Sequence, residues 1–153
     1  VTLSKAMGLA GGAVCGSEDL CSAVRNFGRA YVYSTSVPPM IAAGLCEAIG
    51  VMRDEPWRQR RVRDLAQRVR QAIRGVLEVV GEDESPIVPI ILGDEQSALS
   101  AARELEEAGL LVVAVRPPTV RPGTSRLRVT LSCEHSDDEV EELIGALRRI
   151  RGR

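Results

Sequence analysis

The stretch Val1-Thr2-Leu3-Ser4-Lys5-Ala6-Met7-Gly8 decides how this sequence is interpreted, because it contains the only lysine of the chain. All the other basic residues among the twenty lysines and arginines are arginines, so lysine is not the ordinary surface charge here. A lysine that loses its proton in a desolvated site can attack a carbonyl and form a Schiff base, whereas arginine cannot. From this stretch alone, a solvated lysine near a chain end is the better interpretation, and only distant residues can overturn it.

The composition is that of a globular protein without a basic or aromatic surface. Of the 153 residues, 44% are hydrophobic and 3% are aromatic, and the net charge is -1. This balance argues against nucleic-acid binding, which uses basic fields and aromatic stacking. No apolar run approaches the roughly twenty residues that a membrane span requires, and the first residues lack the pattern of a signal peptide. We therefore expect a cytoplasmic protein without nucleic-acid or membrane partners.

The cysteines and the single histidine do not have metal-site spacing. His135 stands alone, and the cysteines lie too irregularly for a Cys-x-x-Cys pair. We predict no metal and reduced, partly buried thiols. The cysteines are Cys15, Cys21, Cys46 and Cys133.

The segment after Lys5 predicts a helix between two strands. Residues 8–16 combine dense glycines with a short apolar run compatible with a buried strand, and they match neither a P-loop nor a Rossmann fingerprint. Ser17, followed by two acidic residues, predicts a helix over 18–27. Residues 30–35 are rich in aromatic and β-branched side chains, which predicts a strand, and Ser36 is placed to cap the helix that follows.

Three hydroxyl side chains, those of Ser34, Thr35 and Ser36, cluster where that strand would end. The carboxyl ends of strands are where α/β folds bind ligands. The same hydroxyls would equally serve as a plain capping cluster for the next helix. Both interpretations stay open from the residues alone.

A long helical pattern occupies residues 40–80, with one break near residues 53–56. Its second half carries a single apolar stripe, and arginines populate the other faces. We interpret this arginine-rich surface as mostly a solvated helix face, because acidic residues elsewhere balance the charge and no aromatic residues are interleaved.

The carboxyl-terminal part predicts a small α+β module. A polar turn at residues 81–86 precedes a change to short elements, which predicts a domain boundary near residue 80. We expect an antiparallel or mixed sheet with helices on one face. The predicted strands are 86–92, 110–115 and 126–131, and the predicted helices are 95–108 and one opened by the capping box Ser136-Asp137-Asp138-Glu139.

Three stretches together resemble the pyridoxal-phosphate-dependent α-oxoamine synthases. They are Thr2-Leu3-Ser4-Lys5-Ala6-Met7-Gly8, Tyr33-Ser34-Thr35-Ser36-Val37-Pro38-Pro39 and Arg116-Pro117-Pro118-Thr119-Val120-Arg121-Pro122-Gly123-Thr124-Ser125-Arg126-Leu127-Arg128. Their order and spacing cover nearly the whole chain and match the carboxyl-terminal part of such an enzyme. The resemblance implies the α/β architecture of fold-type I, aminotransferase-like enzymes.

In that architecture the chain would contain three parts. Residues 1–53 would be the end of the large cofactor-binding domain and residues 54–80 a linking helix. Residues 81–153 would be the small carboxyl-terminal α+β domain.

The resemblance assigns four residues to pyridoxal 5'-phosphate. Lys5 looks like the catalytic lysine that binds this cofactor covalently, and Thr2 like a threonine that hydrogen-bonds its phosphate. Ser34 and Thr35 match hydroxyl residues that reach the phosphate of the neighbouring subunit's cofactor. The resemblance therefore implies a homodimer with active sites at the interface.

Two further residues match substrate-binding positions. Arg116 resembles the arginine that holds the amino-acid carboxylate, and Thr119 a residue of the substrate pocket. A planar guanidinium suits a carboxylate bidentately, and the two prolines after Arg116 stiffen the loop that must aim it.

The implied reaction condenses an amino acid with an acyl thioester, with decarboxylation. The loops at residues 33–39 and 116–120 look like the oxononanoate synthase branch of the family. In that branch the substrates would be L-alanine and pimeloyl-CoA or a pimeloyl carrier protein, in biotin biosynthesis. Another α-oxoamine synthase, similar to glycine C-acetyltransferase, and a non-catalytic dimerisation fragment remain as alternatives.

The family pattern also extends upstream of this sequence. The aspartate that pairs with the pyridine nitrogen and the histidine that stacks on the ring are expected before the lysine, and His135 lies after it. The chain also opens without methionine, in a strand-like segment. We therefore expect it to be part of a longer protein and predict that it is inactive by itself.

Overall fold

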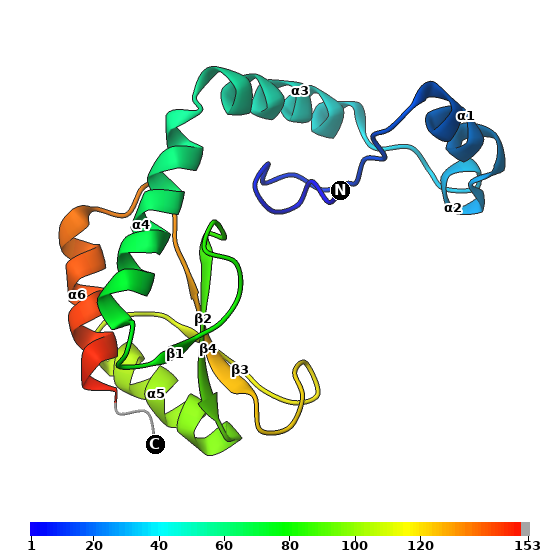
Figure 1. Cartoon of the computed structure of the whole chain (residues 1–153). Helices are drawn as coiled ribbons and strands as arrows, with labels where there is room; N and C mark the ends of the chain where they lie inside the picture. The colour runs from blue at the N-terminus through cyan, green and yellow to red at the C-terminus, as the bar shows by residue number, and fades with distance from the viewer. Residues whose placement is uncertain (151–153) are drawn as a thin grey trace. The chain divides into compact units, whose positions relative to one another are not determined.

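The structure, a computed structural model, describes residues 1–150. The chain divides into two compact units, Val1–Pro56 and Trp57–Arg153, whose elements are labelled in Figure 1. The segment interpreted as a linking helix contributes its first three residues to the first unit and the remainder to the second.

The first unit consists of a doubled-back amino-terminal loop and three helices. One bridge joins Thr2 to Gly12 within the loop. The prediction of a helix over residues 18–27 is confirmed, because Ser17 caps α1 by accepting a hydrogen bond from the Leu20 N–H at 3.3 Å. None of residues 1–56 is buried. The helices are α1 (Glu18–Phe27), α2 (Arg29–Val32) and α3 (Pro39–Asp54).

The predicted strand over residues 30–35 is wrong. The N–H groups of Tyr31 and Val32 both donate to the Gly28 carbonyl, at 2.8 and 2.9 Å, and these bonds close the helical turn of α2. Aromatic and β-branched residues favour strands when they pack on a half-buried sheet surface. Here Tyr31 and Tyr33 are exposed, so that packing term is missing and the local helical turn forms instead.

Two smaller predictions in this unit are also wrong. Ser36 does not cap the next helix, because α3 starts at Pro39 with Pro38 in the cap position and no side-chain cap bond. A proline suits the first helical turn because its missing N–H would have no partner there. The apolar run at residues 13–15 forms no strand, and Val14 is exposed.

The second unit is a four-stranded antiparallel sheet with three helices. The sequence predicts an antiparallel or mixed sheet with three of these strands, whereas the edge strand β1 was not predicted because its residues fall in the segment expected to be helical. The strand order is β1-β2-β4-β3. The central pair is in register with Val88 opposite Val129 and Ile90 opposite Leu127. The elements are α4 (Trp57–Ile73), β1 (Glu78–Val79), β2 (Ile87–Gly93), α5 (Glu95–Glu107), β3 (Val113–Val115), β4 (Ser125–Thr130) and α6 (Asp137–Arg149).

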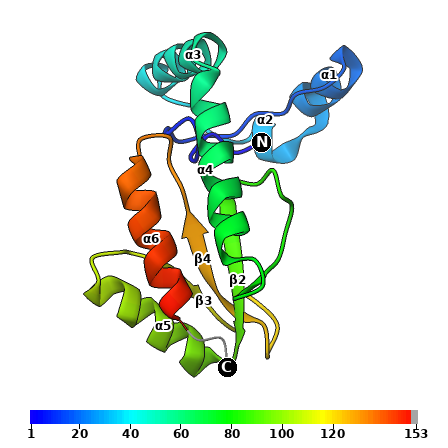
Figure 2. The same ribbon diagram turned by 60° about the vertical axis from the view of Figure 1, so that its left-hand side comes forward.

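One face of this sheet carries the core. Side chains alternate along a strand, so Leu127 and Val129 of β4 point to the helices while Arg128 between them is exposed. Figure 2 shows α4, α5 and α6 against the sheet, and their buried residues join the same cluster, including Leu65, Leu105 and Leu147. Burying one such leucine contributes roughly 1.5–3 kcal/mol relative to leaving it exposed.

The helical pattern predicted to continue to Val80 ends earlier. Helix α4 stops at Ile73, and Gly75 adopts a φ of 81°, a left-handed conformation that favours glycine. Val76 extends the apolar stripe in sequence but is exposed, whereas Leu77 is buried. The turn therefore redirects the chain into β1 before the stripe is complete.

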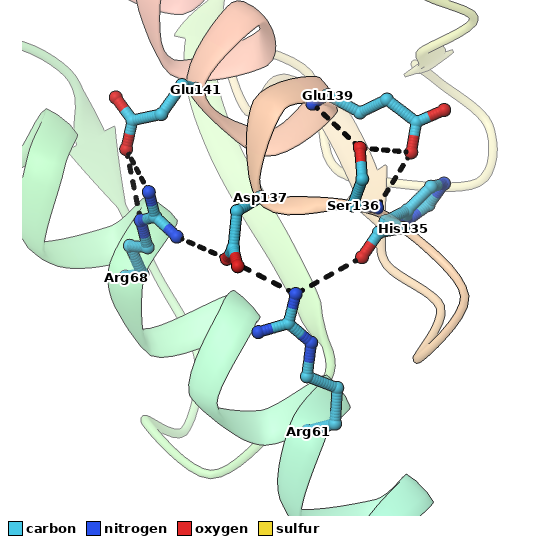
Figure 3. A network of polar contacts seen from close by, with 7 residues as sticks. All are labelled: Arg61, Arg68, His135, Ser136, Asp137, Glu139 and Glu141. Carbon is cyan, nitrogen blue, oxygen red and sulfur yellow. Dashed lines mark hydrogen bonds and ion pairs between the residues drawn. The ribbon is translucent and has the colours of Figure 1, made fainter.

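The arginines of α4 are less solvated than predicted. Arg68 donates to Asp137 at 2.6 Å and to Glu141 at 2.5 Å, and Arg61 donates to Asp137 at 3.2 Å (Figure 3). Arg58 contacts Glu134 at 2.6 Å. These ion pairs tie α4 to α6 and to the loop before it. The prediction of a solvated helix face therefore holds for Arg60, Arg63 and Arg74, which are exposed, but not for the three paired arginines, which are half-buried.

The same network begins with a capping box at α6, which the sequence predicts and the structure confirms. The Ser136 hydroxyl accepts from the Glu139 N–H at 3.2 Å, and the Glu139 carboxylate accepts from the Ser136 N–H at 2.8 Å (Figure 3). The hydrogen bonds from Ser136 hold the pKa of Glu139 below its usual value. The hydrogen bond and charge of Arg61, followed by those of Arg68, lower the pKa of Asp137.

Arg70 points the other way and is buried. Its guanidinium donates to the backbone carbonyls of Asp83, Ser85 and Ile87, at 3.2, 2.8 and 2.6 Å. One side chain of α4 therefore fixes the loop that leads into β2.

The structure also bears on the predictions made from the cysteines, the histidine and the hydropathy of the chain. All four cysteines are free thiols, but Cys15 and Cys46 are exposed, so partial burial holds only for Cys21 and Cys133. Among residues 1–150, no group of histidine, cysteine and acidic side chains is placed to hold a metal ion. Over the same residues, no helix combines the length and the apolar character that crossing a membrane requires.

Candidate functional site

Lys5 lies at the turn of the amino-terminal loop. Its carbonyl accepts from the Gly8 N–H at 2.9 Å, and Gly8 has a φ of 67°. No atom lies within 4 Å of the position that a Cβ of Gly8 would occupy, so the turn needs glycine for its backbone conformation and not for space. The two arms of the loop are held together by the Leu3 N–H, which donates to the Gly11 carbonyl at 3.0 Å. The lysine side chain is exposed at the tip of this loop.

Two hydroxyls accompany Lys5 in the same loop. The Thr2 and Ser4 side-chain oxygens lie 3.0 Å apart, and both residues are exposed. A primary amine can bind an aldehyde covalently, and hydroxyls can donate to phosphate oxygens. An amine and two hydroxyls are therefore the kinds of group that could hold an aldehyde and a phosphate, as in pyridoxal 5'-phosphate.

Ser34 and Thr35 follow α2 in the same unit and are also exposed. The Ser34 hydroxyl donates to the Ala30 carbonyl in a short hydrogen bond, so it terminates the helical turn. This contact belongs to the preceding helix α2, so Ser34 does not cap the next helix as the capping interpretation expected. Thr35 lies one residue further along, in the extended segment before Pro38.

Arg116 and Thr119 share one turn of the second unit. The loop that joins β3 to β4 starts directly after the pair between Val115 and Arg126, so Arg116 is its first residue. The Thr119 N–H donates to the Arg116 carbonyl at 3.1 Å, and the Pro117–Pro118 peptide bond within this turn is cis. Arg116 and Thr119 are both exposed.

Two residues near this loop were not singled out from the sequence. Arg126 of β4 donates through Nε to the Thr124 carbonyl at 3.0 Å, which fixes the far end of the loop. Glu95, the first residue of α5, places a carboxylate oxygen 3.9 Å from Arg116 Nη1. The acidic first turn of α5 was the only sequence signal for Glu95, and it indicates a helix start rather than a partner for a loop arginine.

The structure thus groups the predicted residues within each unit. Thr2 and Lys5 share one loop, Ser34 and Thr35 are neighbours in the same unit, and Arg116 and Thr119 share one turn in the other unit. Two hollows of about 590 and 320 Å³ in the second unit are lined by other residues, the larger mainly by α5 and the smaller by α6, β4 and the segment after α5. Because none of the predicted site residues lines these two hollows, we do not place the substrate there.

The fold and these residues define a class of protein. The sequence profile of the aminotransferase class I and II family matches residues 1–147, and the chain belongs to that family. It is an α/β segment of the fold-type I architecture, whose enzymes use pyridoxal phosphate.

Particular members of the family are similar over nearly the whole chain. The 8-amino-7-oxononanoate synthase of Pseudomonas putida is 44% identical over 146 residues, which are 95% of this chain and 37% of that protein. The crystal structure of 8-amino-7-oxononanoate synthase from Francisella tularensis superposes with a TM-score of 0.83 at 26% identity, over 97% of this chain and 43% of that one. A structure of SPT with PLP gives a TM-score of 0.88 at 26% identity, over 97% and 38% of the two chains.

All these matches cover less than half of the relative's own length. The chain spans about 38% of the length of the 8-amino-7-oxononanoate synthases that it matches. The family match, over residues 1–147, includes both Lys5 and Arg116.

Proposed function

We propose that these residues belong to a pyridoxal-phosphate-dependent acyltransferase that condenses L-alanine with a pimeloyl thioester, with decarboxylation, in biotin biosynthesis. The observation that carries the proposal is the similarity to 8-amino-7-oxononanoate synthases, 40–44% identical over 95–99% of this chain. The donor set around Lys5 and the exposed guanidinium of Arg116 are consistent with it.

In this proposal the residues of the chain have separate tasks. Lys5 would hold the cofactor through its amine, and the Thr2 hydroxyl would donate to its phosphate. The hydroxyls of Ser34 and Thr35 would donate to the phosphate of the neighbouring subunit's cofactor. When bound, the cofactor supplies an electron sink for the α-carbon of the amino acid. Once the amine of the amino acid has displaced the Lys5 amine from the cofactor, Lys5 would accept and return the proton at the α-carbon as a general base. Arg116 binds the amino-acid carboxylate with its planar guanidinium.

Borohydride reduction tests the assignment of Lys5. In the full-length protein that carries these residues, loaded with cofactor, reduction should leave a pyridoxyl group on the peptide that contains Lys5. Peptide mass spectrometry locates the group. Lys5→Arg keeps the positive charge but cannot form the imine, so it serves as the matched control and should carry no label. A label elsewhere, or none on the wild-type peptide, would remove Lys5 from this role.

The proposal also includes a homodimer, and it states that activity requires residues beyond the 153 of this chain. The first unit has no buried side chain. Phe27, Tyr33 and Met40 are 83%, 80% and 79% exposed. In this proposal the neighbouring subunit and further chain cover these side chains. We therefore expect residues 1–153 alone to lack activity, and the full-length protein to sediment as a dimer in analytical ultracentrifugation. A fully active monomer would contradict the assignment of Ser34 and Thr35 to a neighbouring subunit's site.

A further inference from the structure

Arg116 has an acidic neighbour that the proposed reaction does not use. Glu95 Oε2 lies 3.9 Å from Arg116 Nη1, and the two side chains are 55% and 52% exposed. In residues 1–150 this is the one ion pair recorded for Arg116. A guanidinium that is to bind a substrate carboxylate therefore already faces a carboxylate of its own chain.

The pairing of the strands places Glu95 and Arg116 at the same end of the sheet. Strand β2 ends at Gly93, which pairs with Ser125 of β4, and α5 begins two residues later with Glu95. Strand β3 ends at Val115, which pairs with Arg126 of the same β4. Because β2 and β3 flank β4 on either side, the start of α5 and the start of the Arg116 loop lie at the same end of the sheet.

The start of α5 also keeps Glu95 in place. Asp94 caps the helix by accepting from the Ser97 N–H at 2.8 Å and from the Ser97 hydroxyl at 2.6 Å. A carboxylate in the first helical turn is favoured by the partial positive charge of the unpaired backbone N–H groups. The backbone of Glu95 is thus held at the start of a capped helix, whereas Arg116 lies in a loop.

We propose that Glu95 is the counter-ion of Arg116 in the absence of substrate, and that the amino-acid carboxylate competes with it for the guanidinium. The inference rests on the proposed role of Arg116 as the carboxylate anchor. Glu95 would act through Arg116 and is therefore a positioning residue. It would limit amino-acid affinity, because the incoming carboxylate must replace or share an existing partner.

The magnitude follows from the exposure of the pair. Exposed ion pairs of this kind are weak, so removing Glu95 should tighten amino-acid binding only about two- to five-fold. The effect should appear in the dissociation constant and KM for the amino acid and leave KM for the acyl thioester unchanged. It should also shrink as salt is added, because counter-ions screen exposed charges.

The test compares Glu95→Gln with Glu107→Gln in the full-length, cofactor-loaded protein. Both changes remove one exposed carboxylate from α5, but Glu107 lies at the other end of the helix. Spectroscopic titration with L-alanine gives the dissociation constant, and steady-state kinetics gives the two KM values. The proposal expects tighter alanine binding for E95Q only. Unchanged or weaker binding in E95Q would overturn it.

A second background separates this inference from the proposed function. In Arg116→Gln the guanidinium is gone, so E95Q should no longer tighten alanine binding if Glu95 acts through Arg116. A benefit of E95Q that persists in that background would show direct repulsion and overturn the counter-ion role. Failure of Arg116→Gln by itself to weaken alanine binding would instead refute the anchor role of Arg116, whatever E95Q does.

Discussion

Replacing Arg70 by methionine tests how strongly one buried side chain fixes the second unit. Arg70 is 6% exposed, and three backbone carbonyls accept hydrogen bonds from its guanidinium. Methionine keeps a long unbranched stem but donates nothing, so those carbonyls lose their partner. The loop before β2 should then lose its attachment to α4.

The expected cost follows from these contacts. At roughly 0.5–1.5 kcal/mol for each hydrogen bond, three bonds contribute about 3 kcal/mol. Removing a buried charge whose Nε has no partner in the described part of the chain offsets some of this cost. We therefore expect Arg70→Met to lower the free energy of unfolding by about 2 kcal/mol.

Urea unfolding of the 153-residue chain measures this difference. Trp57, the single tryptophan, begins α4 and reports through its fluorescence on the helix that carries Arg70. With a slope of about 2 kcal/mol/M, the midpoint should fall by about 1 M. Arg63→Met changes an exposed arginine of the same helix and should shift the free energy by less than about 0.5 kcal/mol. Equal midpoints for the two variants would refute the idea that the guanidinium holds the loop.

Three further predictions use the polar contacts of the second unit and its loop. The pKa of Asp137 lies below its usual value of 3.8, so its contribution to stability is present above that pH and is lost as the pH falls through the folded-state pKa. When unfolding is monitored by circular dichroism, the loss of stability as the pH falls below about 4 should therefore be less steep in Asp137→Asn than in wild type. Equal pH profiles would contradict the stabilising role of the Asp137 carboxylate. Ser136→Ala should cost about 1 kcal/mol in thermal unfolding because the capping box at α6 is lost, and an unchanged melting temperature would speak against it. In the full-length protein, Arg116→Lys should weaken alanine binding in a spectroscopic titration while cofactor affinity stays the same, because a point charge replaces a planar fork; unaltered alanine affinity would remove Arg116 from the carboxylate role.

The sequence predicts the second unit well because several local signals agree there. Ser136 and Glu139 form a capping box in both the sequence and the structure, and the alternation of Leu127 and Val129 with exposed neighbours marks β4. Agreement between caps, turns and periodicity is what allows one structure to be predicted from local patterns.

The first unit is harder to predict, because aromatic and β-branched residues indicate a strand only where they pack against a sheet, and residues 1–56 provide no such surface. Tyr31 and Tyr33 indicate a strand by composition, but their exposure shows that no sheet surface covers them within residues 1–56. Gly75 ends α4 by its backbone conformation, although the apolar period continues to Val76. In the first place the packing that a strand needs is missing, and in the second a turn ends the helix. Neither feature can be read from composition or periodicity.

The candidate site was predicted in a similarly uneven way. Lys5 and Arg116 stand out by residue type and by resemblance, and the structure gives each a defined turn. Glu95 could not be paired with Arg116 from the sequence, because their proximity depends on β2 and β3 both pairing with β4. Contacts between ends of different strands follow from sheet order, which local patterns do not determine.

The absence of a buried side chain in Val1–Pro56 has a calorimetric consequence. Unfolding absorbs heat and raises the heat capacity largely because packed apolar surface becomes hydrated. The first unit has little such surface to release. A differential scanning experiment on the 153-residue chain should therefore record one endotherm whose enthalpy and heat-capacity step correspond to residues Trp57–Arg153, with the first unit contributing only a shallow slope before it.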